Sequence, residues 1–135
     1  MIFDTNVVID LIEGSSSPLF DDNIARLMTR HRFFINEIIF AELAGRYASS
    51  EEVSGLLHDL GLHMARLTLP DCYRAGVAFH AYRKNGGART TILPDFLIGA
   101  HAAGQGWPLV TRDRKGFAAY FPEVELIDPM KVSND

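Results

Sequence analysis

Short apolar runs alternate along this chain with longer segments in which apolar residues recur at helical spacing. The apolar runs predict buried strands, at Met1–Phe3, Phe33–Ile35, Ala65–Leu69, Leu109–Val110 and Val124–Ile127. The longer segments predict helices, at Val7–Ile12, Asn23–His31, Glu37–Tyr47, Glu52–Leu60, Cys72–Arg83 and Asp95–Ala103. This alternation is typical of an α/β fold in which a parallel sheet is covered by helices on both faces.

Turn and cap residues agree with these boundaries. Gly14, three serines and Pro18 predict a loop, and Asp71 is expected to cap the helix that follows Pro70. Glycines are expected to end two later helices, at Gly86, Gly87, Gly104 and Gly106. Because no repeat or linker divides the sequence, we expect one domain over residues 1–135.

The first apolar run stops at a carboxylate, in "MIFDTNVVIDLI". In an open parallel sheet, functional groups gather beyond the carboxyl ends of the strands. Asp4 is therefore expected at that edge of the sheet. Thr5 or Asn6 would begin the next helix, where backbone N–H groups lack partners within the helix.

Three other acids occupy similar positions, although each has an ordinary structural explanation. Glu42 interrupts an apolar helix face, but it could simply pair with Arg46 at i,i+4 spacing. Asp95 begins a helix whose small residues predict close packing on the sheet, but it could be a cap. Asp113 follows the run "WPLVTRD", where Asp is also common in turns.

The joint placement of these four acids suggests a metal site. Carboxylates that converge repel one another, so they require a compensating cation. Oxygen ligands without a cluster of Cys or His favour Mg²⁺ or Mn²⁺. The reaction that such a site supports best is phosphodiester hydrolysis.

Composition restricts the class of protein. The 135 residues are 47% hydrophobic and 22% charged, as in a compact globular domain. Cys72 is the one cysteine, and we expect a cytoplasmic protein without a signal peptide or membrane span. The net charge of −4 argues against a general nucleic-acid binder unless a metal neutralises the gathered acids.

Four segments together resemble a known family, the PIN-domain ribonucleases, and most closely the VapC-type toxins of bacterial toxin–antitoxin pairs. The segments are "FDTNVVIDLI", "INEIIFAELAGR", "LPDFLIGAHA" and "LVTRDRKGF", and "YFPEVELIDP" resembles the last strand of the family. The resemblance covers essentially the whole chain in the same order. It implies a PIN-like three-layer sandwich, in which a short, mostly parallel five-stranded sheet lies between helices.

The resemblance also implies roles for particular residues. Its four acidic metal ligands and catalytic residues correspond to Asp4, Glu42, Asp95 and Asp113. The supporting positions correspond to Thr5, Asn6, which is more often Ser in the family, and Thr111, the hydroxyl beside the first aspartate. Many relatives have an acid where this chain has Gly116, so the number of metal ions, one or two, stays open.

The implied activity is a Mg²⁺-dependent endoribonuclease with Mn²⁺ as a substitute, a small antitoxin partner and a homodimeric state. Basic residues flank two of the acids and are either solvated surface or RNA contacts, namely Arg83, Lys84, Arg89, Arg112, Arg114 and Lys115. Two alternatives remain, a catalytically silent PIN-like binding module and an aspartyl-phosphate phosphotransferase that uses Asp4 as nucleophile. Nothing in the sequence identifies the RNA target.

Overall fold

A single parallel sheet forms the centre of the protein. The computed structural model describes residues 1–14, 17–87 and 93–131. The strands are β1 (Ile2–Phe3), β2 (Phe33–Ile35), β3 (Leu62–Met64), β4 (Leu109–Val110) and β5 (Leu126–Ile127). They are ordered β3-β2-β1-β4-β5, and every neighbouring pair is parallel. The expected α/β architecture is therefore confirmed.

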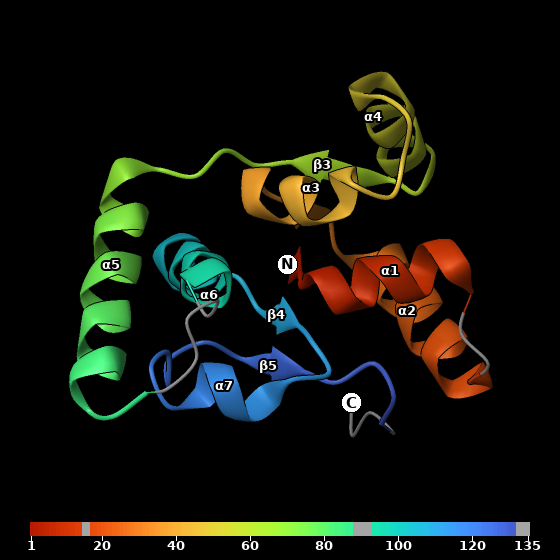
Figure 1. The fold of residues 1–135 in the computed structure, drawn as a ribbon. Coiled ribbons are helices and arrows are strands. Elements are labelled where there is room, and N and C mark those ends of the chain that lie inside the picture. The colour runs from red at the N-terminus through yellow and green to blue at the C-terminus, as the bar shows by residue number, and fades with distance from the viewer. Residues whose placement is uncertain (15–16, 88–92, 132–135) are drawn as a thin grey trace.

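Helices cover both faces of this sheet. They are α1 (Thr5–Glu13), α2 (Pro18–Arg30), α3 (Glu37–Ala44), α4 (Ser50–Asp59), α5 (Leu69–Lys84), α6 (Leu93–Gln105) and α7 (Arg114–Ala118). Figure 1 shows α1 and α2 on one side of the strands and α5 and α6 on the other. The molecule thus has three layers, as the resemblance implied.

The order of the strands places β1 at the point where the chain changes direction across the sheet. From β1 the chain proceeds to β2 and β3 on one side, and it returns to β4 on the other side of β1. Ile2 is paired with both Phe34 and Leu109, and the Asp4 N–H donates to the Val110 carbonyl at 2.9 Å. The carboxyl ends of β1 and β4 therefore meet at a topological switch point, where ligands bind in open α/β sheets.

Aromatic side chains fix the layers around the sheet. Phe3 and Phe33 lie on adjacent strands with ring centroids 4.4 Å apart, and both are buried. On the other face, the Phe96 ring of α6 lies between Tyr82 of α5 and Tyr120 at the end of α7. Each buried Phe stabilises the fold by roughly 1.5–3 kcal/mol. Aromatic contacts therefore join strands on one face and helices on the other.

Two expected features near residue 70 are wrong. The edge strand β3 spans Leu62–Met64 instead of Ala65–Leu69, and Leu69 already belongs to α5. Thr68 caps α5 by accepting a hydrogen bond from the Asp71 N–H at 3.2 Å, because Pro70 fits the first turn of a helix. Asp71, the expected cap, is instead buried against α6 and accepts a hydrogen bond from Gln105.

The remaining differences lie at the ends of elements. Pro18 begins α2 after the Ser17 cap and is not part of the loop. The short helix α7 was not predicted, because its five residues carry no clear periodicity. No helix in the described ranges is long and apolar enough to cross a bilayer.

Candidate functional site

Asp4 is a buried carboxylate at the switch point. It is only 5% exposed and forms the N-cap of α1. Its Oδ1 accepts a hydrogen bond from the Thr5 N–H at 2.8 Å. Its Oδ2 accepts from the Thr111 hydroxyl at 2.8 Å and from the Asn6 amide at 3.2 Å. The expected support of Asp4 by Thr111 is present, and these bonds fix the orientation of the carboxylate.

Asp113 is linked to Asp4 through Thr111. The fully buried Thr111 hydroxyl accepts a hydrogen bond from the Asp113 N–H at 3.0 Å while it donates to Asp4. The Asp113 side chain caps α7 by accepting from the Gly116 N–H at 3.5 Å. One hydroxyl therefore sets the position of both strand-exit aspartates.

Glu42 reaches the site from α3. Its Oε1 accepts a hydrogen bond from the Thr5 hydroxyl at 2.6 Å. Glu42 is exposed, whereas Ile39 and Leu43 are buried, so it lies at the edge of the apolar helix face and not within it. The alternative pairing with Arg46 is absent, because Arg46 binds Glu13 at 2.8 Å.

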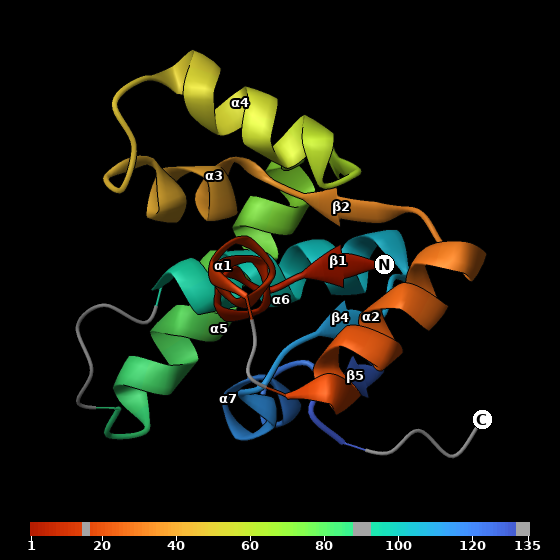
Figure 2. The same cartoon turned by 90° about the vertical axis from the view of Figure 1, so that its right-hand side faces the viewer.

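Asp95 lies half-buried in the first turn of α6. That turn is at the same end of the sheet as the start of α1 and α7 (Figure 2). The small-residue face behind it, including Ile98, Gly99 and Ala102, is buried as expected. The structure thus links Glu42 to Asp4 through Thr5 and Asp113 to Asp4 through Thr111. It places the turn that carries Asp95 at the same edge.

Burial and like charge act together on Asp4. Burial raises the pKa of the Asp4 carboxyl above its usual value, and the neighbouring Glu42 and Asp113 raise it further. The hydrogen bonds from Thr111 and Thr5 lower the pKa and so favour the ionised form. An ionised Asp4 therefore lies in an electrostatically unfavourable position that a cation can relieve.

The donor chemistry fits a hard divalent cation. In the described part of the chain, no group of three or more His, Cys, Asp or Glu side chains is placed so that it could hold a metal ion as a cage. Mg²⁺ does not require such a cage, because it keeps several waters and binds through one or two carboxylates plus substrate phosphates. Asp4 with Glu42 or Asp113 can supply those carboxylates, so the residues present fit the ion.

The basic candidates have different surroundings. Arg114 and Lys115 are exposed in α7, and Arg83 and Lys84 are exposed at the end of α5. Arg112, a candidate for either solvated surface or RNA contact, has its Nε 2.9 Å from Asp10 Oδ2 on α1. Arg89 lies outside the described residues.

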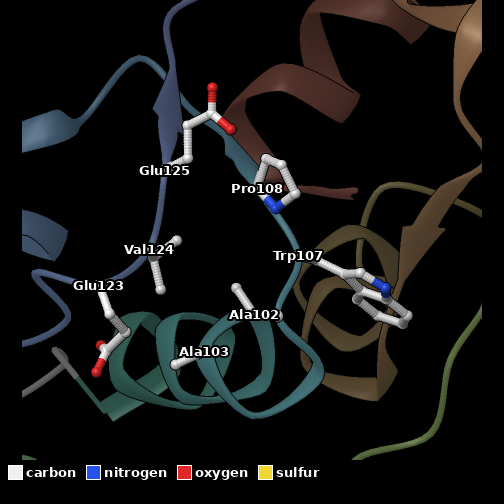
Figure 3. A pocket seen from close by; sticks show the side chains of 8 residues that line it. Ala102, Ala103, Trp107, Pro108, Glu123, Val124 and Glu125 are labelled. Carbon is white, nitrogen blue, oxygen red and sulfur yellow. The ribbon is translucent and has the colours of Figure 1, made fainter.

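A pocket elsewhere in the fold is separate from the carboxylates. Figure 3 shows its lining, which includes Trp107, Pro108, Glu123 and Glu125. Pro108 precedes β4, and Glu123 and Glu125 precede β5. The pocket therefore lies at the amino ends of these strands, opposite to Asp4.

Sequence reasoning missed two polar contacts between distant segments near the site. Asn36 caps α3 through its Oδ1, so its amide faces Nδ1 of His101 on α6 at 3.1 Å. Burial lowers the pKa of His101, as expected for a neutral ring that accepts this bond. This contact and the Asp10–Arg112 pair join segments far apart in the chain. The i,i+4 spacing of Asn6 and Asp10 was the one available signal.

The family model described as PIN domain matches residues 1–121. No curated protein matches the chain significantly.

Solved structures share the fold at low sequence identity. A chain of VapBC-1 from nontypeable Haemophilus influenzae has a TM-score of 0.73 at 22% identity, covering 97% of this chain and 100% of its own. A chain of VapBC2 from Rickettsia felis, bound to a promoter DNA fragment, has a TM-score of 0.69 at 21% identity, covering 93% and 97%. A chain of a toxin–antitoxin complex from Klebsiella pneumoniae has a TM-score of 0.64 at 23% identity, covering 97% and 98%.

Replacing Asp4 by Asn should leave the metal-free protein equally stable or more stable at neutral pH. Because the pKa of Asp4 is raised above 3.8 in the folded state, the folded protein holds this proton more tightly than the unfolded chain. The favourable contribution of Asp4 is present below 3.8 and is lost as the pH rises through the folded pKa. The advantage of Asp4→Asn should therefore disappear in acid.

Urea unfolding of both proteins in chelator, across a pH series, measures this difference. Asp59→Asn is the matched control, because the Asp59 side chain is 83% exposed on α4. A large loss of stability in Asp4→Asn at neutral pH would show that the Asp4 carboxylate is structural.

Proposed function

Because this chain belongs to the PIN domain family, we propose that it is a metal-dependent endoribonuclease of the VapC toxin type. The carrying observation is the buried Asp4 carboxylate at the switch point, whose pKa is raised by burial and by Glu42 and Asp113. Such an arrangement is unfavourable for folding alone and becomes favourable when a divalent cation is bound. Binding of a divalent cation would explain why Asp4, Glu42 and Asp113 lie close together.

The contacts of the proposed site residues indicate two roles, metal binding and orientation of Asp4. Asp4, Glu42 and Asp113 would hold Mg²⁺ or Mn²⁺, with Asp95 facing the same edge from α6. Thr111 and the Thr5 N–H keep the Asp4 carboxylate oriented and favour its ionised form. When bound, the ion would polarise a phosphate oxygen and activate water for attack on phosphorus.

Loss of RNA cleavage on chelation and on single neutralising substitutions tests this activity. Asp4→Asn, Glu42→Gln and Asp113→Asn should each lower the rate at least roughly 100-fold, since each removes charge stabilisation worth several kcal/mol. Asp59→Asn should cleave like the parent. The measurement is single-turnover cleavage of a labelled RNA pool with Mg²⁺, with Mn²⁺ and with chelator.

Two outcomes would contradict the activity. Cleavage that persists in chelator would exclude the metal mechanism. An absence of cleavage by a metal-loaded parent protein would favour the silent binding module. Phosphate-mimic labelling of Asp4 would instead indicate the aspartyl-phosphate alternative.

A small antitoxin is the proposed protein partner. The support is structural likeness to chains of VapBC assemblies and of a toxin–antitoxin complex, over nearly the full length of each. Expression of this chain alone should arrest growth, and co-expression with an antitoxin that binds it should restore growth. Harmless expression of a chain that cleaves RNA freely in vitro would contradict the toxin assignment.

Self-association is also proposed. Leu69, Tyr73 and Val77 recur at four-residue spacing along α5 and are exposed. They form one apolar stripe, which is the kind of surface that a partner covers. The mass of the purified protein in solution tests the expected homodimer.

The exposed cations near the site are proposed to contact RNA phosphates. The end of α5 and α7 lie at the same end of the molecule as the carboxyl ends of the strands (Figure 2). Arg83→Ala with Lys84→Ala should weaken RNA binding most at low salt and reduce the log–log salt slope by about 0.7 for each lost contact. Affinity is measured across a salt series with Ca²⁺ replacing Mg²⁺ to suppress cleavage.

A charge-matched control is available at the opposite end of the sheet. Arg30 ends α2 and Arg32 precedes β2, and both are exposed. Arg30→Ala with Arg32→Ala removes the same charge far from the carboxylates. Equal slopes for the two double variants would show that only net charge matters and that the RNA follows another path.

A further inference from the structure

The residue between Thr111 and Asp113 is held on α1 at two points. The Arg112 backbone N–H donates to the Asn6 side-chain oxygen at 3.5 Å. The Arg112 guanidinium Nε is 2.9 Å from Asp10 Oδ2. Asn6 and Asp10 are four residues apart on α1 and therefore share one helix face. That face therefore binds residue 112 through both its main chain and its side chain.

The contacts of Asn6 and Asp10 with Arg112 lie next to the proposed metal site. Asn6 also donates to Asp4 Oδ2, so it contacts both Asp4 and the segment that carries Asp113. Thr111 makes the second link between these two aspartates. The segment from Thr111 to Asp113 is thus bonded to Asp4 at residue 111 and to α1 at residue 112.

Asp10 has features of a positioning group rather than a surface charge. Its side chain is 20% exposed, and its Oδ2 is enclosed without a hydrogen bond, although Arg112 Nε is within ion-pair distance. An enclosed carboxylate oxygen depends on its one counter-charge much more than an exposed one does. Asp10 therefore restricts where Arg112 can lie.

We propose that Asp10 and Arg112 are positioning residues that hold Asp113 beside Asp4 and thereby raise the affinity of the carboxylate site for divalent metal. The proposal rests on the metal site of the proposed function. Arg112 accordingly acts through the placement of Asp113, in contrast to Arg114 and Lys115, for which RNA contact is proposed. Groups that orient ligands in this way commonly change metal affinity when they are removed.

The direction in which Mn²⁺ affinity changes when an arginine is removed separates a positioning role from a purely electrostatic one. Removing a cation near a carboxylate site reduces repulsion of the incoming metal, so Arg114→Ala should tighten Mn²⁺ binding slightly. Arg112→Ala removes the same charge on the other side of Asp113. If Arg112 positions Asp113, its loss should weaken Mn²⁺ binding by about 10-fold.

The experiment is Mn²⁺ titration of the full chain without RNA, for the parent, Arg114→Ala, Arg112→Ala, Asp10→Asn and the Asp10→Asn/Arg112→Ala double variant. Two residues that act as a pair give non-additive losses, so the double variant should bind like either single variant. Cooperative thermal unfolding of each metal-free variant shows that it is folded. If Arg112→Ala does not fold, Asp10→Asn is expected to show the same weakening.

The outcomes of these titrations distinguish failure of the positioning role from failure of the metal site itself. Binding by Arg112→Ala as tight as the parent, or tighter, overturns the positioning role, as does a double variant whose loss is the product of the two single losses. A parent protein that does not bind Mn²⁺ overturns the metal site itself and the proposed function with it. Weakening in Arg112→Ala with no weakening in Arg114→Ala supports the positioning role.

Discussion

The burial of one carboxylate at the end of the central strand constrains the rest of this structure. Asp4 is nearly inaccessible to solvent, and burial raises its pKa. A buried carboxylate requires hydrogen-bond donors in fixed positions, and here they come from the start of α1 and from Thr111 after β4. The parallel pairing of β1 with β4 brings those donors together. The strand order therefore supplies the hydrogen-bond donors that the buried Asp4 carboxylate requires.

The neighbouring acids add an electrostatic cost to the burial of Asp4. Glu42 is held by the Thr5 hydroxyl, and Asp113 is held by Thr111, so both lie close to the charge that they repel. Structural needs alone would favour uncharged side chains at these positions. The elements that bring the acids close also restrain them, because α3 is fixed to α6 through Asn36 and His101. The fold thus maintains an electrostatic strain that metal binding would relieve, and this links the PIN fold to the proposed nuclease chemistry.

Sequence reasoning located the strand-exit residues because their signal is local. An apolar run followed by an acid marks the end of a buried strand, and this rule placed Asp4, Thr111 and Asp113 at one edge of the sheet. It failed at β3, because an edge strand with exposed His63 and Met64 lacks a continuous apolar run. The contacts of Asn36 with His101 and of Asp10 with Arg112 could not be predicted, since each depends on how two distant elements pack. The exposed position of Glu42 has the same origin, because helical spacing alone does not show which edge of α3 meets α1.

The most direct test of the account is the location of Mn²⁺ in crystals of the protein, identified by its anomalous scattering. A peak is expected within coordination distance of a carboxylate oxygen of Asp4, with Glu42 or Asp113 as a further ligand and waters completing the shell. Peaks confined to other acidic side chains, with Asp4 hydrogen-bonded as in the metal-free fold, would contradict it.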